Sequence, residues 1–120
     1  MPTLVAVVAS DVSTRERLAA LVPSDGFEVT LSAPEGVPAT LPNLFVIALP
    51  GLDTPEEQLI EQLRADETSA DVPIIIVSAL PMVQLQSVPY ASDWTIAIVE
   101  EPVQASVMAD TLKFLLNPDA

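Results

Sequence analysis

The feature that most constrains the fold is an unbroken apolar run, residues 44–49 (LFVIAL), which the turn pair Pro50-Gly51 ends. An apolar run this short, bounded by turn residues, is typical of a β-strand buried on both faces. Such a strand belongs in the middle of a parallel sheet, where ligands bind at the carboxyl ends of the strands. This strand ends in Ala48 and Leu49, so no reactive side chain stands where a ligand would bind.

Further strand patterns alternate with helical patterns along the chain. We predict strands at 4–9, 27–31, 72–77 and 94–99, and helices after residue 11, at 54–65 and at 103–116, with a short irregular helix at 81–89. Residues 33–42 hold three prolines and a glycine, so the second helix is shortened to one turn or absent. The pattern predicts one α/β domain over residues 1–120: a flavodoxin-like open parallel sheet of five strands, order 2-1-3-4-5, with helices on both faces.

Two helices carry finer expectations. Ser13 and Glu16 are spaced as a capping box at the start of the first helix, and Asp11 is the alternative cap. In the last helix, the apolar spacing predicts that the sheet is faced by Val107, Met108, Leu112 and Leu115.

The composition excludes several classes of function. The chain has no cysteine and no histidine, which removes zinc-finger sites, Ser-His-Asp catalysis and histidine ligands. With four basic and seventeen acidic residues, a net charge of -13, it cannot build the basic patch that nucleic acids or anionic membranes require. The start of the chain lacks the basic region of a signal peptide, and prolines interrupt the uncharged residues 72–92. We therefore expect a cytoplasmic protein.

Several motifs occur in the order found in one protein family. They are Pro42-Asn43 before the central strand, Pro50-Gly51-Leu52-Asp53 after it, Arg64-Ala65-Asp66 through Asp71-Val72-Pro73 and Ser78-Ala79, and Pro102 after the last strand. Together they resemble the receiver domains of bacterial response regulators, over nearly the whole chain. The resemblance implies a module of two-component or phosphorelay signal transduction.

The same resemblance implies a site that this chain has lost. Receivers carry a phospho-acceptor aspartate at the end of the third strand, an acid pair for magnesium after the first, and a lysine after the fifth. Here the acid pair falls on Ala9 and Ser10, the acceptor on Ala48 or, with another gap placement, Val46, and the lysine on Glu101. The hydroxyl that ends the fourth strand survives as Ser78, and the neighbouring proline as Pro102.

Two other interpretations of the polar residues remain open. Asp11, Asp53, Glu100 and Glu101 lie near the carboxyl edge of the predicted sheet and could form a relocated carboxylate metal site, of which Asp11 and Asp53 are the weak candidates. We favour helix capping and solvated acids for these four, and therefore expect no metal. Ser78 either binds a phosphate oxygen, as in receivers, or satisfies backbone groups at the end of its strand, which we favour.

We therefore expect a pseudo-receiver: a receiver-like module that is neither phosphorylated nor an enzyme, has no cofactor, and binds a protein partner or a second copy. The expected surface is the face of the fourth helix, fifth strand and fifth helix, because its uncharged residues 81–90 include Met82, Val83, Leu85, Val88 and Tyr90. One alternative is a working phospho-acceptor that uses Asp53 or Asp11. Another is a small-molecule or divalent-ion binder on the same fold.

Overall fold

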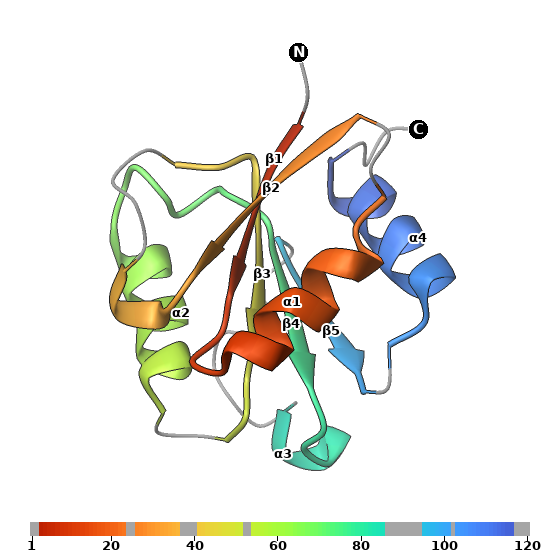
Figure 1. Ribbon diagram of the computed structural model, residues 1–120. Helices are drawn as coiled ribbons and strands as arrows, with labels where there is room; N and C mark the ends of the chain where they lie inside the picture. Colours follow the sequence, from red (N-terminus) through yellow and green to blue (C-terminus); the bar gives the residue numbers. More distant parts are fainter. Residues whose placement is uncertain are drawn as a thin grey trace.

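The computed structural model describes residues 3–23, 26–36, 41–51, 54–85, 95–101 and 103–116, together with the backbone but not the side chain of Met82. Five parallel strands form one sheet in the order β2-β1-β3-β4-β5 (Figure 1). Their bounds are β1 Thr3–Val8, β2 Phe27–Ser32, β3 Leu44–Ala48, β4 Ile74–Ser78 and β5 Ile96–Glu100. The predicted fold class and strand order are thus confirmed. No helix within these ranges is long and apolar enough to cross a membrane.

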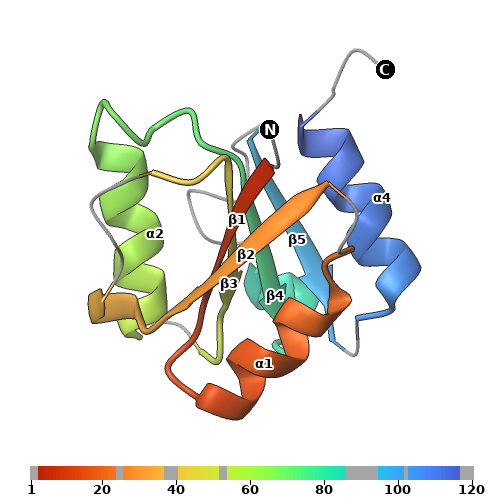
Figure 2. The same cartoon turned by 45° about the horizontal axis from the view of Figure 1, so that its top comes forward.

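Helices cover both faces of the sheet, which separates the core into two layers. On one face lie α1 (Val12–Leu21) and α4 (Ala105–Leu116), and on the other α2 (Pro55–Ala65) and α3 (Met82–Leu85) (Figures 1 and 2). Every residue of β3 and β4 is buried, as expected for strands with neighbours on both sides and a helix layer on each face. Successive residues of β3 therefore alternate between the two layers.

The edge strand and the connection that follows it agree with the sequence pattern. β2 pairs only with β1 among the described strands, and all its residues except the last, Ser32, are partly buried or exposed. After β2, the described part of the connection holds a single 3-10 turn, η1 (Pro34–Gly36). The prolines of this stretch explain why the helix is so short, because each removes a backbone donor and clashes with a preceding helical turn.

The cap of α1 is Asp11, so the predicted capping box of Ser13 and Glu16 is wrong. The Asp11 carboxylate accepts hydrogen bonds from the backbone N–H of Thr14 at 3.0 Å and from its hydroxyl at 2.9 Å. The first N–H groups of a helix have no acceptor within the helix, and an aspartate at the N-cap accepts from one of them. These bonds hold the pKa of Asp11 below its usual value, the hydroxyl contact having the largest effect.

One prediction for the last helix is also wrong. Met108 and Leu112 are fully buried and Leu115 packs against the core, but Val107 is 42% exposed. Residues one position apart differ by about 100° around a helix, so Met108 facing the sheet turns Val107 away. Phe114 lies two turns further along the same side and is 67% exposed.

Arg64, at the end of α2, ties three segments together at the amino ends of the strands. Its guanidinium donates to the carbonyl oxygens of Ser69 at 3.2 Å and Val72 at 2.9 Å, and to the Thr95 hydroxyl at 2.7 Å. One side chain thus holds the turn after α2, the approach to β4 and the approach to β5.

Candidate functional site

The candidate site is the edge of the sheet where the parallel strands end. The register pairs Val8 of β1 with Ile47 of β3, so the residues that follow, Ala9 and Ala48, come next to each other at this edge. The next pairs along the edge are Ala48 with Val77, and Ser78 with Glu100. The spatial order across the edge is therefore Ala9, Ala48, Ser78 and then Glu101, as the parallel register requires.

The two candidates for the acceptor position differ in their place in the sheet. Val46 pairs with Val7 and Ile75 in the middle of the sheet and has no exposed surface. Ala48 is the last residue of β3 and keeps a small exposed fraction at the carboxyl edge. The residue that ends the central strand is thus Ala48, whose methyl group can neither accept a phosphoryl group nor hold a metal ion.

Ser78 uses its hydroxyl inside the fold. Its Oγ donates to the carbonyl oxygen of Leu49 at 2.7 Å and accepts from the backbone N–H of Leu80 at 3.1 Å, and the residue is buried. Both bonds satisfy backbone groups at the ends of β3 and β4, where the ladder stops. This geometry agrees with the backbone-satisfying interpretation of Ser78 that the sequence favoured.

Glu101 forms an ion pair across the edge. Its Oε1 lies 2.6 Å from Nη2 of Arg17, which projects from α1. Its backbone N–H also donates to the carbonyl oxygen of Ser78 at 2.9 Å. The resemblance to receivers would place a positively charged lysine at this position after the fifth strand. Glu101 is negatively charged instead, and Arg17 neutralises its charge. Arg17 is one of only four basic residues in the chain, so an ion pair with one of the many acidic residues could be expected. The sequence around Arg17 does not indicate which acidic residue it pairs with.

A second polar contact at this edge was not anticipated from the sequence. The Ser10 hydroxyl donates to Oε2 of Glu56 at 3.0 Å, and Glu56 is only 2% exposed. Glu56 lies in the first turn of α2, where the N-terminal end of the helix dipole favours a negative charge. The contact joins the end of β1 to the start of α2, so Ser10 acts here as a donor within the fold.

The acidic candidates do not assemble into a metal site within the described ranges. Asp11 is exposed and caps α1, Glu100 is exposed at the end of β5, and Glu101 is paired with Arg17. No group of three or more acidic side chains there is arranged to hold a metal ion. Asp53 and Pro102 lie outside the described residues.

The expected interaction surface is only partly described. Val83 on α3 is 76% exposed, as a contact residue should be, whereas Leu85 is completely buried against the α2 layer of the core. Including Leu85 in the surface was therefore wrong, because this side chain packs into the apolar core on the α2 side of the sheet. The side chain of Met82, and Val88 and Tyr90 altogether, lie outside the described residues.

Comparison with known proteins gives matches in structure alone. A scan against models of protein families finds no match, and a search of curated protein sequences finds none either. The overall structure nevertheless matches many solved structures.

Three of these structures illustrate the likeness. The signal receiver domain of a histidine kinase from Syntrophus aciditrophicus is 17% identical with a TM-score of 0.79, over 98% of this chain and 92% of that one. A CheY-like receiver domain protein from Methanospirillum hungatei is 16% identical with a TM-score of 0.77, over 98% and 96%. The receiver domain of a sensor histidine kinase from Pseudomonas aeruginosa, with magnesium in its active-site cleft, is 15% identical with a TM-score of 0.76, over 97% and 98%. The chain therefore has the fold of response-regulator receiver domains.

Proposed function

We propose that this protein is a receiver-like signalling module that is not phosphorylated and acts by binding proteins rather than by catalysis. The observation that carries the proposal is the carboxyl edge, where Ala9 and Ala48 lie next to each other and Glu101 is paired with Arg17. Phosphoryl transfer needs an acceptor, a held divalent cation and positive charge over the developing negative charge. Ala9 and Ala48 supply neither an acceptor nor a metal ligand, and the positive charge of Arg17 is already paired with Glu101.

The remaining polar groups at the edge support the same proposal. Ser10 donates to Glu56 and Ser78 bridges two backbone groups, so both hydroxyls already have partners within the fold. A phosphoryl group would have to break these contacts before it could use either hydroxyl. The fold supplies the surfaces of a signalling domain without its chemistry.

Incubation with acetyl phosphate and Mg²⁺, followed by intact-mass measurement, tests the absence of phosphorylation. We expect an unchanged mass, while a receiver domain with its acceptor aspartate, treated in parallel, gains one phosphoryl group. The alternative is a working acceptor at Asp53 or Asp11. A gain of one phosphoryl group that disappears in Asp53→Asn or in Asp11→Asn would establish that alternative and overturn the proposal.

The proposed contact surface is the face made by α3, β5 and α4, for a protein partner or a second copy. It is supported by exposed apolar side chains: Val83 on α3, and Val107 and Phe114 on one side of α4. Apolar patches left exposed on a folded protein often mark contact sites. A net charge of -13 makes two copies repel in general, so contacts should use a surface with few charges.

Phe114→Glu and Leu31→Glu form a matched pair for testing this surface. Phe114 is 67% exposed on α4, while Leu31 is 47% exposed on β2, at the opposite end of the sheet from β5. Light scattering and pull-down of the full chain should show self-association or partner binding that Phe114→Glu removes and Leu31→Glu keeps. A monomer in all three proteins, with partner binding unchanged by Phe114→Glu, would refute the surface.

A further inference from the structure

A groove lies between η1 and residues 55–62 of α2, on the face of the sheet opposite α1 and α4. Figures 1 and 2 both show η1 directly against α2. The groove has a volume of about 170 Å³ and is lined by Pro34, Glu35, Pro55, Gln58, Leu59 and Gln62. Because the described connection after β2 makes only one 3-10 turn, this side of α2 is not covered by a full neighbouring helix.

The volume limits what the groove can hold. Pockets for cofactors and drug-sized ligands measure about 300–1,000 Å³, whereas a cavity of about 150 Å³ accepts a group the size of benzene. At about 170 Å³, this groove suits one long side chain rather than a nucleotide or flavin. An incoming side chain from a protein is therefore the occupant that fits the space.

The lining gives the chemistry of that side chain. Pro34 and Leu59 are buried at the base of the groove, and Glu35 is exposed and carries the only charge among the described residues that line it. Gln58 and Gln62 add amide oxygens, which accept hydrogen bonds. The accessible lining is more polar than apolar, and its carboxylate and amide oxygens match a cationic group. Among cationic side chains, the guanidinium forms the stronger paired contacts with carboxylates.

We propose that this groove binds an arginine side chain from a basic segment of a protein partner. The net charge of -13 favours the approach of such a segment, and Glu35 in the lining is the carboxylate proposed to pair with its guanidinium. The groove is separate from the face of α3, β5 and α4. The inference rests on the proposed function only in that it assumes a protein partner. Phosphorylation measured by intact mass would overturn the proposed function and leave this titration unaffected.

The test is a titration of the ¹⁵N-labelled full chain, followed by amide chemical shifts. The probe is the capped pentapeptide Gly-Ala-Arg-Ala-Gly, with versions in which alanine or glutamate replaces the arginine. We expect saturable shifts centred on residues 34–36 and 55–62 with the arginine peptide, and none with the other two. Shifts elsewhere only, or equal shifts with the alanine peptide, would overturn the proposal. Arginine amide that binds as tightly as the peptide would also overturn it, since the ligand would then be a free cation.

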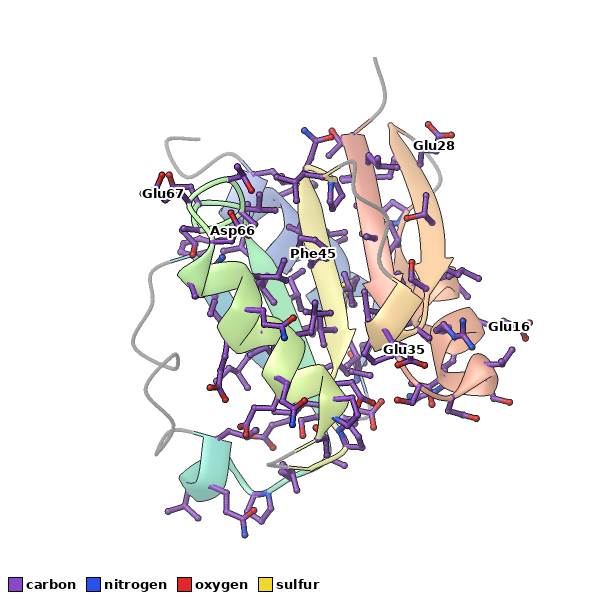
Figure 3. All side chains as sticks on the ribbon, turned by 90° about the vertical axis from the view of Figure 1, so that its left-hand side faces the viewer. Glu16, Glu28, Glu35, Phe45, Asp66 and Glu67 are labelled. Atoms are coloured by element: carbon purple, nitrogen blue, oxygen red, sulfur yellow. The ribbon has the colours of Figure 1, made fainter. Side chains whose placement is uncertain are left out.

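Two variants and a control locate the contact. Glu35→Gln should weaken peptide binding about fivefold, as expected for one partly exposed charge pair, and Gln58→Arg should block binding by filling the groove with a side chain of the protein itself. Glu67→Gln removes the same charge beyond α2, well away from Glu35 in Figure 3, and should leave the affinity unchanged. Equal weakening by Glu35→Gln and Glu67→Gln would show general attraction to an acidic protein and refute the site, as would a Gln58→Arg protein that binds normally.

Discussion

The ion pair between Arg17 and Glu101 should be the strongest polar link between α1 and the end of β5, and a double-mutant cycle can measure it. The nitrogen and oxygen are 2.6 Å apart, and the two side chains are 50% and 23% exposed. Fully exposed pairs contribute about 0.2–1 kcal/mol, whereas removing one partner of a buried pair costs about 3–5 kcal/mol. The pair of Arg17 and Glu101 lies between exposed and buried ion pairs, and is closer to the exposed ones. We expect Arg17→Ala to lower the free energy of unfolding by about 1.5 kcal/mol, with a coupling energy of about 1 kcal/mol.

The assay is urea unfolding followed by circular dichroism for the wild type, Arg17→Ala, Glu101→Gln and the double variant. The measured coupling should shrink between about 0.01 and 1 M NaCl, because the screening length falls from about 30 to about 3 Å. Lys113→Ala is the matched control, since it removes one positive charge from an exposed position on α4. A coupling energy below about 0.3 kcal/mol, or an equal loss of stability in Lys113→Ala, would refute the reasoning.

A charge reversal extends the same experiment. Glu101→Lys places the cation of ordinary receivers opposite Arg17, so two positive charges meet where an ion pair stood. We expect a larger loss of stability than in Glu101→Gln, with recovery when Arg17→Glu is added. If Glu101→Lys were as stable as the wild type, the lysine would have found another partner at this edge and Arg17 would not be the residue that fixes Glu101.

Three further predictions concern other parts of the fold. Arg64→Lys should lower the free energy of unfolding by about 2 kcal/mol, because an ammonium cannot reproduce the three-way contact of the guanidinium, and a loss below about 0.5 kcal/mol in urea unfolding would contradict this. Ser78→Ala should cost about 1–3 kcal/mol in the same assay, since the carbonyl of Leu49 and the N–H of Leu80 lose their partner. The lowered pKa of Asp11 means that its contribution to stability is fully present above its unfolded pKa and is lost as the pH falls through the lower folded pKa. Asp11→Asn should flatten that acid dependence in unfolding experiments at a series of pH values, and an unchanged dependence would exclude Asp11 as its source.

The strands were predictable because each short apolar run fits only a buried position. The fully buried residues of β3 and β4 correspond to the runs LFVIA and IIIV, and the alternating pattern of β2 marks it as an edge strand. A strand that is buried on both faces needs apolar residues at nearly every position. Such a strand can therefore be predicted from its own sequence, without knowing which elements pack against it. Val107 shows the limit of such reasoning, since an apolar residue at approximately the right spacing is 42% exposed.

The contacts of the candidate site could not be predicted in the same way. Glu56 and Ser10 are 46 positions apart in the sequence, and Arg17 and Glu101 are further apart still. Nothing in the local sequence around these residues differs from that of an exposed helix turn or loop. The partners of these residues depend on the order of the strands and on the rotation of each helix about its axis. The hydrophobic pattern predicts where helices and strands occur more accurately than it predicts that arrangement.

The pairing of polar groups at the carboxyl edge bears on where a partner can bind. A partner at this edge would have to break the Arg17–Glu101 ion pair or the contact of Ser10 with the buried Glu56, and would leave charged groups to be satisfied anew. Side surfaces carry no such cost: Phe114 and Val107 are exposed apolar groups on α4, and the groove beside η1 offers an exposed carboxylate. Desolvating apolar surface is favourable, and a rim carboxylate keeps its water until a cation replaces it. The physical expectation is therefore that recognition has moved from the edge of the sheet, where receivers do their chemistry, to the flanking helices α2 and α4.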